Sequence, residues 1–241
     1  IFAKYQRRRF GGEIRFGREL DELGEVYVGA ERYLGEINRK IGAGDLPESE
    51  YDVGSLIGGV ALDTLDDIDF PKEGIRVVLR GRAGLRELGS PNDFQQLTGF
   101  LSKPVTFGRN TLLFRADGGV TLDQLPLEQS YTAGGFFDLS GVPINSVAAS
   151  DYVLGRLIGY RQISESGSGL LGLGLYSGAS VEFGSFSSDD TRLTNRDQLI
   201  AGSVFLGVDT PLFPLYVGAG TAEGGARSLY FAVGRQFRVS R

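Results

Sequence analysis

Four amino acids are absent from the sequence of 241 residues: cysteine, histidine, methionine and tryptophan. Without cysteine and histidine the chain lacks the usual ligands of zinc, and without histidine it has no Ser-His-Asp triad. The absence of cysteine also suits a compartment in which thiols oxidise. We therefore expect no metal ion, no cofactor and no catalytic residue. The joint absence of all four residue types leaves open both a natural protein and an engineered one.

The chain also lacks a basic excess and a long apolar run. It carries 25 basic and 30 acidic residues, for a net charge of −5, so its composition does not predict binding to nucleic acid. No stretch of about 18 consecutive apolar residues is present, which excludes a transmembrane helix. The start has no secretion signal. Because the chain begins at Ile1, we expect it to be a processed or excised piece of a longer polypeptide.

Glycine is abundant instead, since its 37 residues are about twice the usual share. These glycines are spread through segments in which apolar and polar residues alternate. The last such segment places Leu229, Phe231 and Val233 on one face and Tyr230 and Ala232 on the other. A period of two residues predicts a β-strand and not a helix. Glycine within strands is typical of bends and close backbone approach, which barrels need.

Alternating segments recur along the chain and predict one all-β domain over residues 1–241. The first twenty residues fit either one long strand or a hairpin turned at Gly11 and Gly12. Single-chain bacterial barrels have even strand numbers, so we expect about twelve strands. After the first segment, the expected strands are 24–41, 53–62, 75–87, 94–103, 110–121, 128–137, 152–163, 170–183, 198–208, 215–221 and the alternating C-terminal segment.

The connections between these segments alternate between short and long. Counted back from the C-terminus, the long polar ones are 184–195, 139–150, 103–109 and 65–73. Short turns at one end and longer loops at the other are typical of outer-membrane barrels. The segment 42–51 is long but falls on the side where a short turn is expected, and the pattern gives no reason for it.

The predicted strand at 75–87 has its first three arginines on a single face. Arginines opposite an apolar face cannot lie in lipid or in a dry core, but they fit a wet lumen. The arginines near the start of the chain, at positions 7, 8, 9 and 15, fit the same wall. They either favour anions or pair with acids such as Glu13 and Glu31, and we favour pairing because acids outnumber bases. The candidate lumen charges are Arg76, Arg80, Arg82 and Asp117.

These observations predict a closed antiparallel transmembrane β-barrel of about twelve strands, in contact with the lipid bilayer. A soluble all-β binding protein shows the same alternation, but its core is denser and it needs fewer glycines. The interior of a twelve-strand barrel lies between a filled and an open one, so we expect a narrow or partly plugged pore. The expected aromatic girdle consists of Phe10, Phe16, Tyr27, Phe231 and Phe237.

Several motifs, in order along the chain, resemble those of the Omp85 superfamily of outer-membrane barrels. The first is Leu-Asp-Thr-Leu-Asp at 62–66, followed by Phe70-Pro71. The second runs from 125–127 to the tip Leu139, Ser140 and Gly141 and resembles the family's long sixth loop. The third is the turn at 209–216. The last is the final-strand signal with Phe231, Gly234 and Phe237.

The resemblance implies a fold and a set of partners. Within the superfamily, the Leu-Ser-Gly tip is similar to the barrel that follows a patatin-like phospholipase domain in type Vd autotransporters. The family barrel generally has sixteen strands, so the alternative to a twelve-strand barrel is a family barrel that lacks its first strands. The resemblance also implies a passenger domain N-terminal to this chain, and recognition of the C-terminal strand by the barrel-assembly machinery. Ser140 stands where the family usually has an arginine, which calls into question a lock between this loop and lumen acids.

The expected function is that of a membrane anchor and translocator in the bacterial outer membrane, without its passenger, or of a pore scaffold if the barrel is engineered. A passive channel for small solutes and a soluble β binding protein are the alternatives. The chain has no G-x-S-x-G nucleophile elbow, so we do not expect an enzyme.

Overall fold

The computed structural model describes residues 4–41, 49–123, 129–164, 173–188, 198–234 and 236. Within these ranges the protein consists of β-strands and two short 3-10 turns, η1 (Asp21–Leu23) and η2 (Arg86–Leu88). The strands of the large sheet are β1 (Lys4–Glu19), β2 (Gly24–Ile41), β3 (Ser49–Asp63), β4 (Arg76–Gly84), β5 (Phe94–Phe107), β6 (Asn110–Thr121), β9 (Asp151–Ser164), β10 (Gly174–Ser187), β11 (Gln198–Asp209), β12 (Leu215–Ala222) and β13 (Arg227–Val233). Two further short strands, β7 (Tyr131–Ala133) and β8 (Val147–Ala149), pair only with each other.

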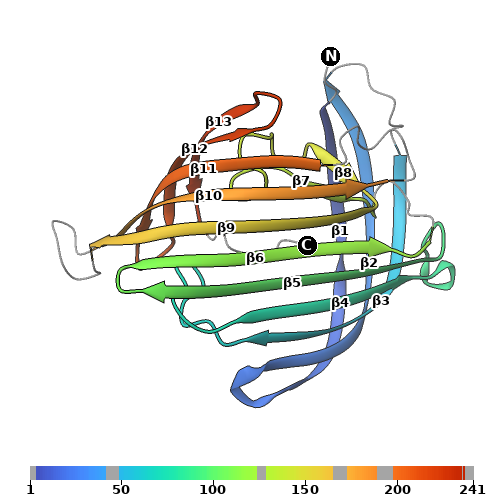
Figure 1. Cartoon of the computed structure of the whole chain (residues 1–241). Coiled ribbons are helices and arrows are strands. Elements are labelled where there is room, and N and C mark those ends of the chain that lie inside the picture. The colour runs from blue at the N-terminus through green and yellow to red at the C-terminus, as the bar shows by residue number, and fades with distance from the viewer. Residues whose placement is uncertain are drawn as a thin grey trace.

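The eleven strands of the large sheet are antiparallel, and each lies beside its neighbour in the chain except that β6 pairs directly with β9. Figure 1 shows a strongly curved sheet in which β1 to β3 run at a steep angle to β5 to β10. Because strands twist in one direction, a sheet of this many strands curls around a hollow. β7 and β8 and the residues between them lie within this curve.

Alternation explains the two faces of the sheet. Along β9, Leu154 and Ile158 are buried on the inner face, whereas Val153 and Leu157 are exposed on the outer face. Strands of 14 residues, such as β9, are long enough to cross an apolar band of about 25 Å. The exposed outer residues are mostly large and apolar, among them Phe10, Ile14, Phe16, Val28, Leu34, Leu79, Leu97, Val181, Val204, Leu206, Val217, Leu229 and Phe231.

The predicted strand at 128–137 is wrong, so within the described residues the large sheet has eleven strands where twelve were expected. Only Tyr131–Ala133 is extended there, and it pairs with β8 instead of joining the wall. Positive φ angles at Gly134, Gly135 and Phe137 turn the chain away from the extended conformation. Alternation in the segment was local to its first few residues, and the rest of it folds inward.

Removing this strand from the count also changes the assignment of the loops. The connections after β2, β6 and β10 now fall at one end of the sheet, and the connection at 64–75 falls at the other. The length of the 42–51 segment is therefore no longer an exception. The expected long loop at 103–109 is wrong, because β5 continues to Phe107 and turns at Gly108, which has a φ of +60°.

Lys4–Glu19 forms one long strand, so the hairpin at Gly11 and Gly12 is wrong. The predicted closure is not seen: over the described ranges, β1 and β13 are the two edges of the sheet, and no pairing joins them. The girdle is also corrected at one position. Tyr27 is buried on the inner face, where its ring lies 4.7 Å from the guanidinium carbon of Arg15.

Candidate functional site

Residues 134–146, here called the inner loop, fill part of the hollow of the sheet. The side chains of Leu139 and Ser140 at its tip are fully buried. The tip has positive φ angles at Leu139 (77°) and Gly141 (99°), so its backbone is compact rather than extended. The loop is long and irregular, yet it lies inside the protein, so its polar groups need partners there.

Glu182 of β10 provides the first partner. Its Oε2 accepts a hydrogen bond of 2.5 Å from the backbone N–H of Ser140, and its Oε1 accepts one of 2.7 Å from the Ser140 hydroxyl. The Ser140 oxygen in turn accepts the N–H of Phe137 at 3.1 Å. Ser180 also donates to Glu182 Oε1, at 2.6 Å. A buried carboxylate needs such donors, and they attach the loop tip to the wall.

Gly141 forms the second attachment, to the last hairpin. Its N–H donates to the hydroxyl oxygen of Tyr230 at 2.7 Å, and its carbonyl accepts a hydrogen bond of 3.1 Å from Ser228. The approach is so close that a Cβ on Gly141 would lie 2.7 Å from backbone atoms of Thr221. A Cβ on Gly220 would lie 2.6 Å from the Cβ of Ser140. Glycine on both sides therefore allows loop and wall to meet.

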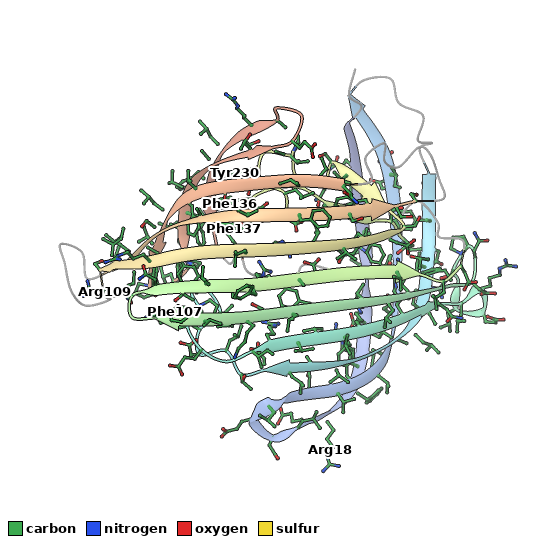
Figure 2. The ribbon with its side chains drawn as sticks, viewed as in Figure 1. Arg18, Phe107, Arg109, Phe136, Phe137 and Tyr230 are labelled. Carbon is green, nitrogen blue, oxygen red and sulfur yellow. The ribbon has the colours of Figure 1, made fainter. Side chains whose placement is uncertain are left out.

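Aromatic rings fix the base of the inner loop. The ring of Phe136 stacks on Phe137, with centroids 3.9 Å apart, and on Tyr230, at 4.8 Å. Figure 2 shows Phe136, Phe137 and Tyr230 gathered beside β10 to β13. Phe137 also contacts Phe205 of β11 edge to face, at 4.9 Å. These contacts bury large apolar areas and give the loop one preferred orientation.

An ion-pair cluster connects the loop to another part of the wall. Arg156 of β9 pairs with Asp117 of β6 and with Asp138 of the inner loop. The Arg156 side chain is almost fully buried, so both carboxylates offset the cost of burying its charge. The inner loop thus contributes one acid to this cluster, and the wall contributes the arginine and the second acid.

A second loop enters the hollow from the opposite end. Asp66 accepts the backbone N–H groups of Lys72 and Glu73, at 2.8 and 2.9 Å, and so shapes the 64–75 loop. Phe70 from this loop is 2% exposed and stacks on Tyr176, with ring centroids 3.9 Å apart. Tyr216 lies between the two loops, since its ring is 5.5 Å from Phe70 and 6.2 Å from Phe136. The two loops together fill the hollow near β9 to β12.

The predicted lumen charges all lie on the inner face, and each has a partner. Arg76 pairs with Asp63 at 3.1 Å. Arg80 and Arg82 both pair with Glu31, at 3.1 and 2.5 Å. At the start of the chain, Arg15 pairs with Glu13, but Arg8 lies on the outer face with Glu36.

The residues of the predicted C-terminal signal lie apart from the inner loop. Phe231 is 73% exposed on the outer face of β13. Gly234 follows this strand with a φ of +92°, and its N–H donates to the carbonyl of Pro214 at 2.8 Å. Phe237 and the segment 125–127 lie outside the described residues.

Sequence reasoning did not identify Glu182, Tyr230, Arg156 or Gly220. The available signal was the alternation of residues along β10. It places Glu182 on the inner face, where a carboxylate without a nearby basic residue needs hydrogen-bond donors from other parts of the chain. In the described part of the chain, no group of three or more acidic side chains is placed to hold a metal ion. The same residues include no helix long and apolar enough to cross a bilayer.

The model of the Omp85 superfamily domain matches residues 1–168. The match covers β1 to β9 and the whole inner loop. It begins earlier than the motifs at 62–71 and ends before the motifs at 209–216 and 231–237. No curated protein matches the chain.

Proposed function

The chain belongs to the Omp85 superfamily, and on this premise we propose that it is the outer-membrane β-barrel part of a polypeptide translocator or membrane anchor. Proteins of this superfamily are in general transporters or insertases of the outer membrane and not enzymes. The outer face of the sheet supports this proposal, because it presents apolar residues in the alternating pattern that a lipid-facing wall requires.

One observation carries the proposal furthest: the inner loop is held in the hollow of the sheet by Glu182, by Tyr230 and by Arg156. A passive pore needs an open path, whereas this interior is partly filled from both ends. A filled interior fits a protein that anchors another polypeptide or lets it pass under control.

The Leu-Ser-Gly tip supports an autotransporter-type barrel with a patatin-like passenger N-terminal to residue 1. The apolar edge strand β13, with Leu229 and Phe231 exposed, supports recognition by the barrel-assembly machinery. We expect no nucleic acid among the partners of this chain.

A passive channel for small solutes is the second candidate. It is favoured by an arginine-lined cavity of about 500 Å³ on the inner face of β1, β2, β4 and β5, which residues 129–132 also line. A channel of this kind conducts ions in a planar bilayer without any passenger.

The test of translocation uses a signal peptide and a reporter domain joined to the N-terminus of the 241-residue chain. The proposal predicts that the chain fractionates with the bacterial outer membrane and that external protease removes the reporter from intact cells. The control is the same reporter without the barrel, which stays protected. A reporter that remains protected while the membrane-embedded chain conducts ions would replace the translocator with the channel.

A further inference from the structure

The wall holds the 64–75 loop partly through groups that every polypeptide carries. Three hydroxyl groups on the inner face of the sheet donate to backbone carbonyls of the loop: Tyr216 to Asp69 at 3.3 Å, Tyr160 to Pro71, and Thr106 to Lys72 at 2.8 Å. These donors belong to β12, β9 and β5. Because every residue of a polypeptide has a carbonyl group, these three hydrogen bonds do not depend on the side chains of the loop.

The ring of Phe70 fits among the tyrosines of the wall. It lies parallel to the ring of Tyr176, with an angle of 5° between the planes, and contacts Tyr160 edge to face, with centroids 5.9 Å apart. The ring of Tyr216 completes the surround. The two residues beside Phe70 in the chain are those whose carbonyls accept from Tyr160 and Tyr216. The wall therefore binds one aromatic ring together with the carbonyl groups on either side of it.

The loop shapes its own turn, so the wall is not needed for this. Asp67 Oδ1 accepts the backbone N–H groups of Asp69 and Phe70, at 2.6 and 2.8 Å. A side chain of the loop also reaches the wall, since Lys72 Nζ donates to Gln162 Oε1 at 3.0 Å. If the loop left the wall, the hydroxyls of the buried tyrosines would lose their acceptors, and a buried donor without an acceptor is unfavourable. The carbonyl groups of another polypeptide could replace them.

We propose that Tyr160, Tyr176, Tyr216 and Thr106 form a binding site for a polypeptide that passes through the barrel, and that residues 69–72 of the loop occupy this site at rest. The site takes an aromatic side chain and the backbone carbonyls beside it, and it accepts many different sequences around that ring. A passing segment with an aromatic residue displaces the loop by making the same contacts. This inference rests on the proposed function, because it is a translocator that brings a polypeptide to the site.

Fluorine NMR of the 241-residue chain in neutral detergent tests the site, with the peptide acetyl-Gly-Phe-Pro-Gly-amide fluorinated on its ring. Phe70→Ala should bind it saturably and about tenfold or more tightly than the wild type, where Phe70 competes within the same molecule. Adding Tyr160→Phe should weaken binding a few-fold, because it removes one hydroxyl donor and keeps the ring. Adding Tyr33→Phe instead is the matched control: its hydroxyl bonds to Gln129, outside the site, so affinity should not change. No binding to Phe70→Ala, or equal effects of the two tyrosine substitutions, would overturn the proposal.

A second measurement keeps Phe70 in place and so does not depend on the folding of that variant. Thr106→Cys introduces a single thiol into this cysteine-free chain. Under mild oxidation it should form a disulfide with a cysteine beside a phenylalanine of a reporter stalled during translocation, whereas Leu79→Cys on the outer face should not. A reporter that reaches the cell surface without forming this disulfide would overturn the site but leave the translocator standing. A reporter that never leaves the cell would overturn the translocator, and with it the role of the site, even if the peptide binds.

Discussion

At the scale of single residues, Glu182 connects the wall to the inner loop through two hydrogen bonds from Ser140, and its carboxylate accepts a third from Ser180 of the same strand. Such a partner was not foreseeable from the sequence, because Ser140 and Glu182 are 42 positions apart and nothing local links them. Ser140 attaches the tip through two donors, its hydroxyl and its own backbone N–H.

We expect Glu182→Gln to destabilise the inner loop. The amide is neutral and has one acceptor oxygen, so it cannot accept from Ser140 N–H and both serine hydroxyls as the carboxylate does. Hydrogen bonds to a charged group contribute about 1.5–3 kcal/mol, and the free energy of unfolding in urea should fall by this amount. Glu36→Gln is the control, since that exposed pair with Arg8 contributes at most about 1 kcal/mol. Equal effects of the two substitutions would contradict the role of Glu182.

Gly220→Ala tests the close approach of loop and wall. The added methyl would lie 2.6 Å from the Cβ of Ser140, so the loop tip must move away from β12. We expect faster proteolysis within residues 134–146 in the folded, membrane-bound chain. Gly155→Ala is matched to it, as a strand glycine whose Cβ would meet nothing within 4 Å. Unchanged proteolysis of Gly220→Ala would show that the loop is not held there.

At the scale of elements, alternation predicted the wall strands well because it depends only on neighbouring residues. The segment Asn110–Thr121 was predicted with its observed bounds, and Gly24–Ile41 as well. The segment 128–137 was misassigned because an apolar loop packed inside a barrel has the same composition as a wall strand. Only contacts with β10 to β13 distinguish the two, and those contacts are distant in the sequence.

The 64–75 loop is expected to obstruct the hollow through Phe70. Its ring is buried against Tyr176, so Phe70→Ala should cost about 3–5 kcal/mol of loop stability and open a path along β9 to β12. Ion conductance in a planar bilayer should rise or flicker more often relative to the wild type. Phe107→Ala removes an exposed ring at the same end of the sheet and should leave conductance unchanged. A wild-type conductance in both variants would mean that this loop does not limit the path.

At the scale of the whole molecule, the two faces of the sheet differ in chemistry and so suit different media. The outer face is apolar along β9 to β13, and the inner face carries the ion pairs, the aromatic rings and the two loops. The sequence predicted this division of faces. It did not predict that β6 pairs with β9. That pairing requires the connection between the two strands to leave the large sheet, and alternation along a strand carries no information about this.

The most direct test is a spin-label scan along β10 in lipid bilayers, using single cysteines in this cysteine-free chain. Oxygen, which concentrates in lipid, should reach labels at Ala179, Val181 and Phe183, while a water-soluble nickel complex should not. Labels at Ser180 and Glu182 should be shielded from both. An alternation of two residues with oxygen access on the odd positions is the result that a lipid-facing wall predicts. Access of the nickel complex to the odd positions, in a chain that stays folded without detergent, would contradict the membrane account.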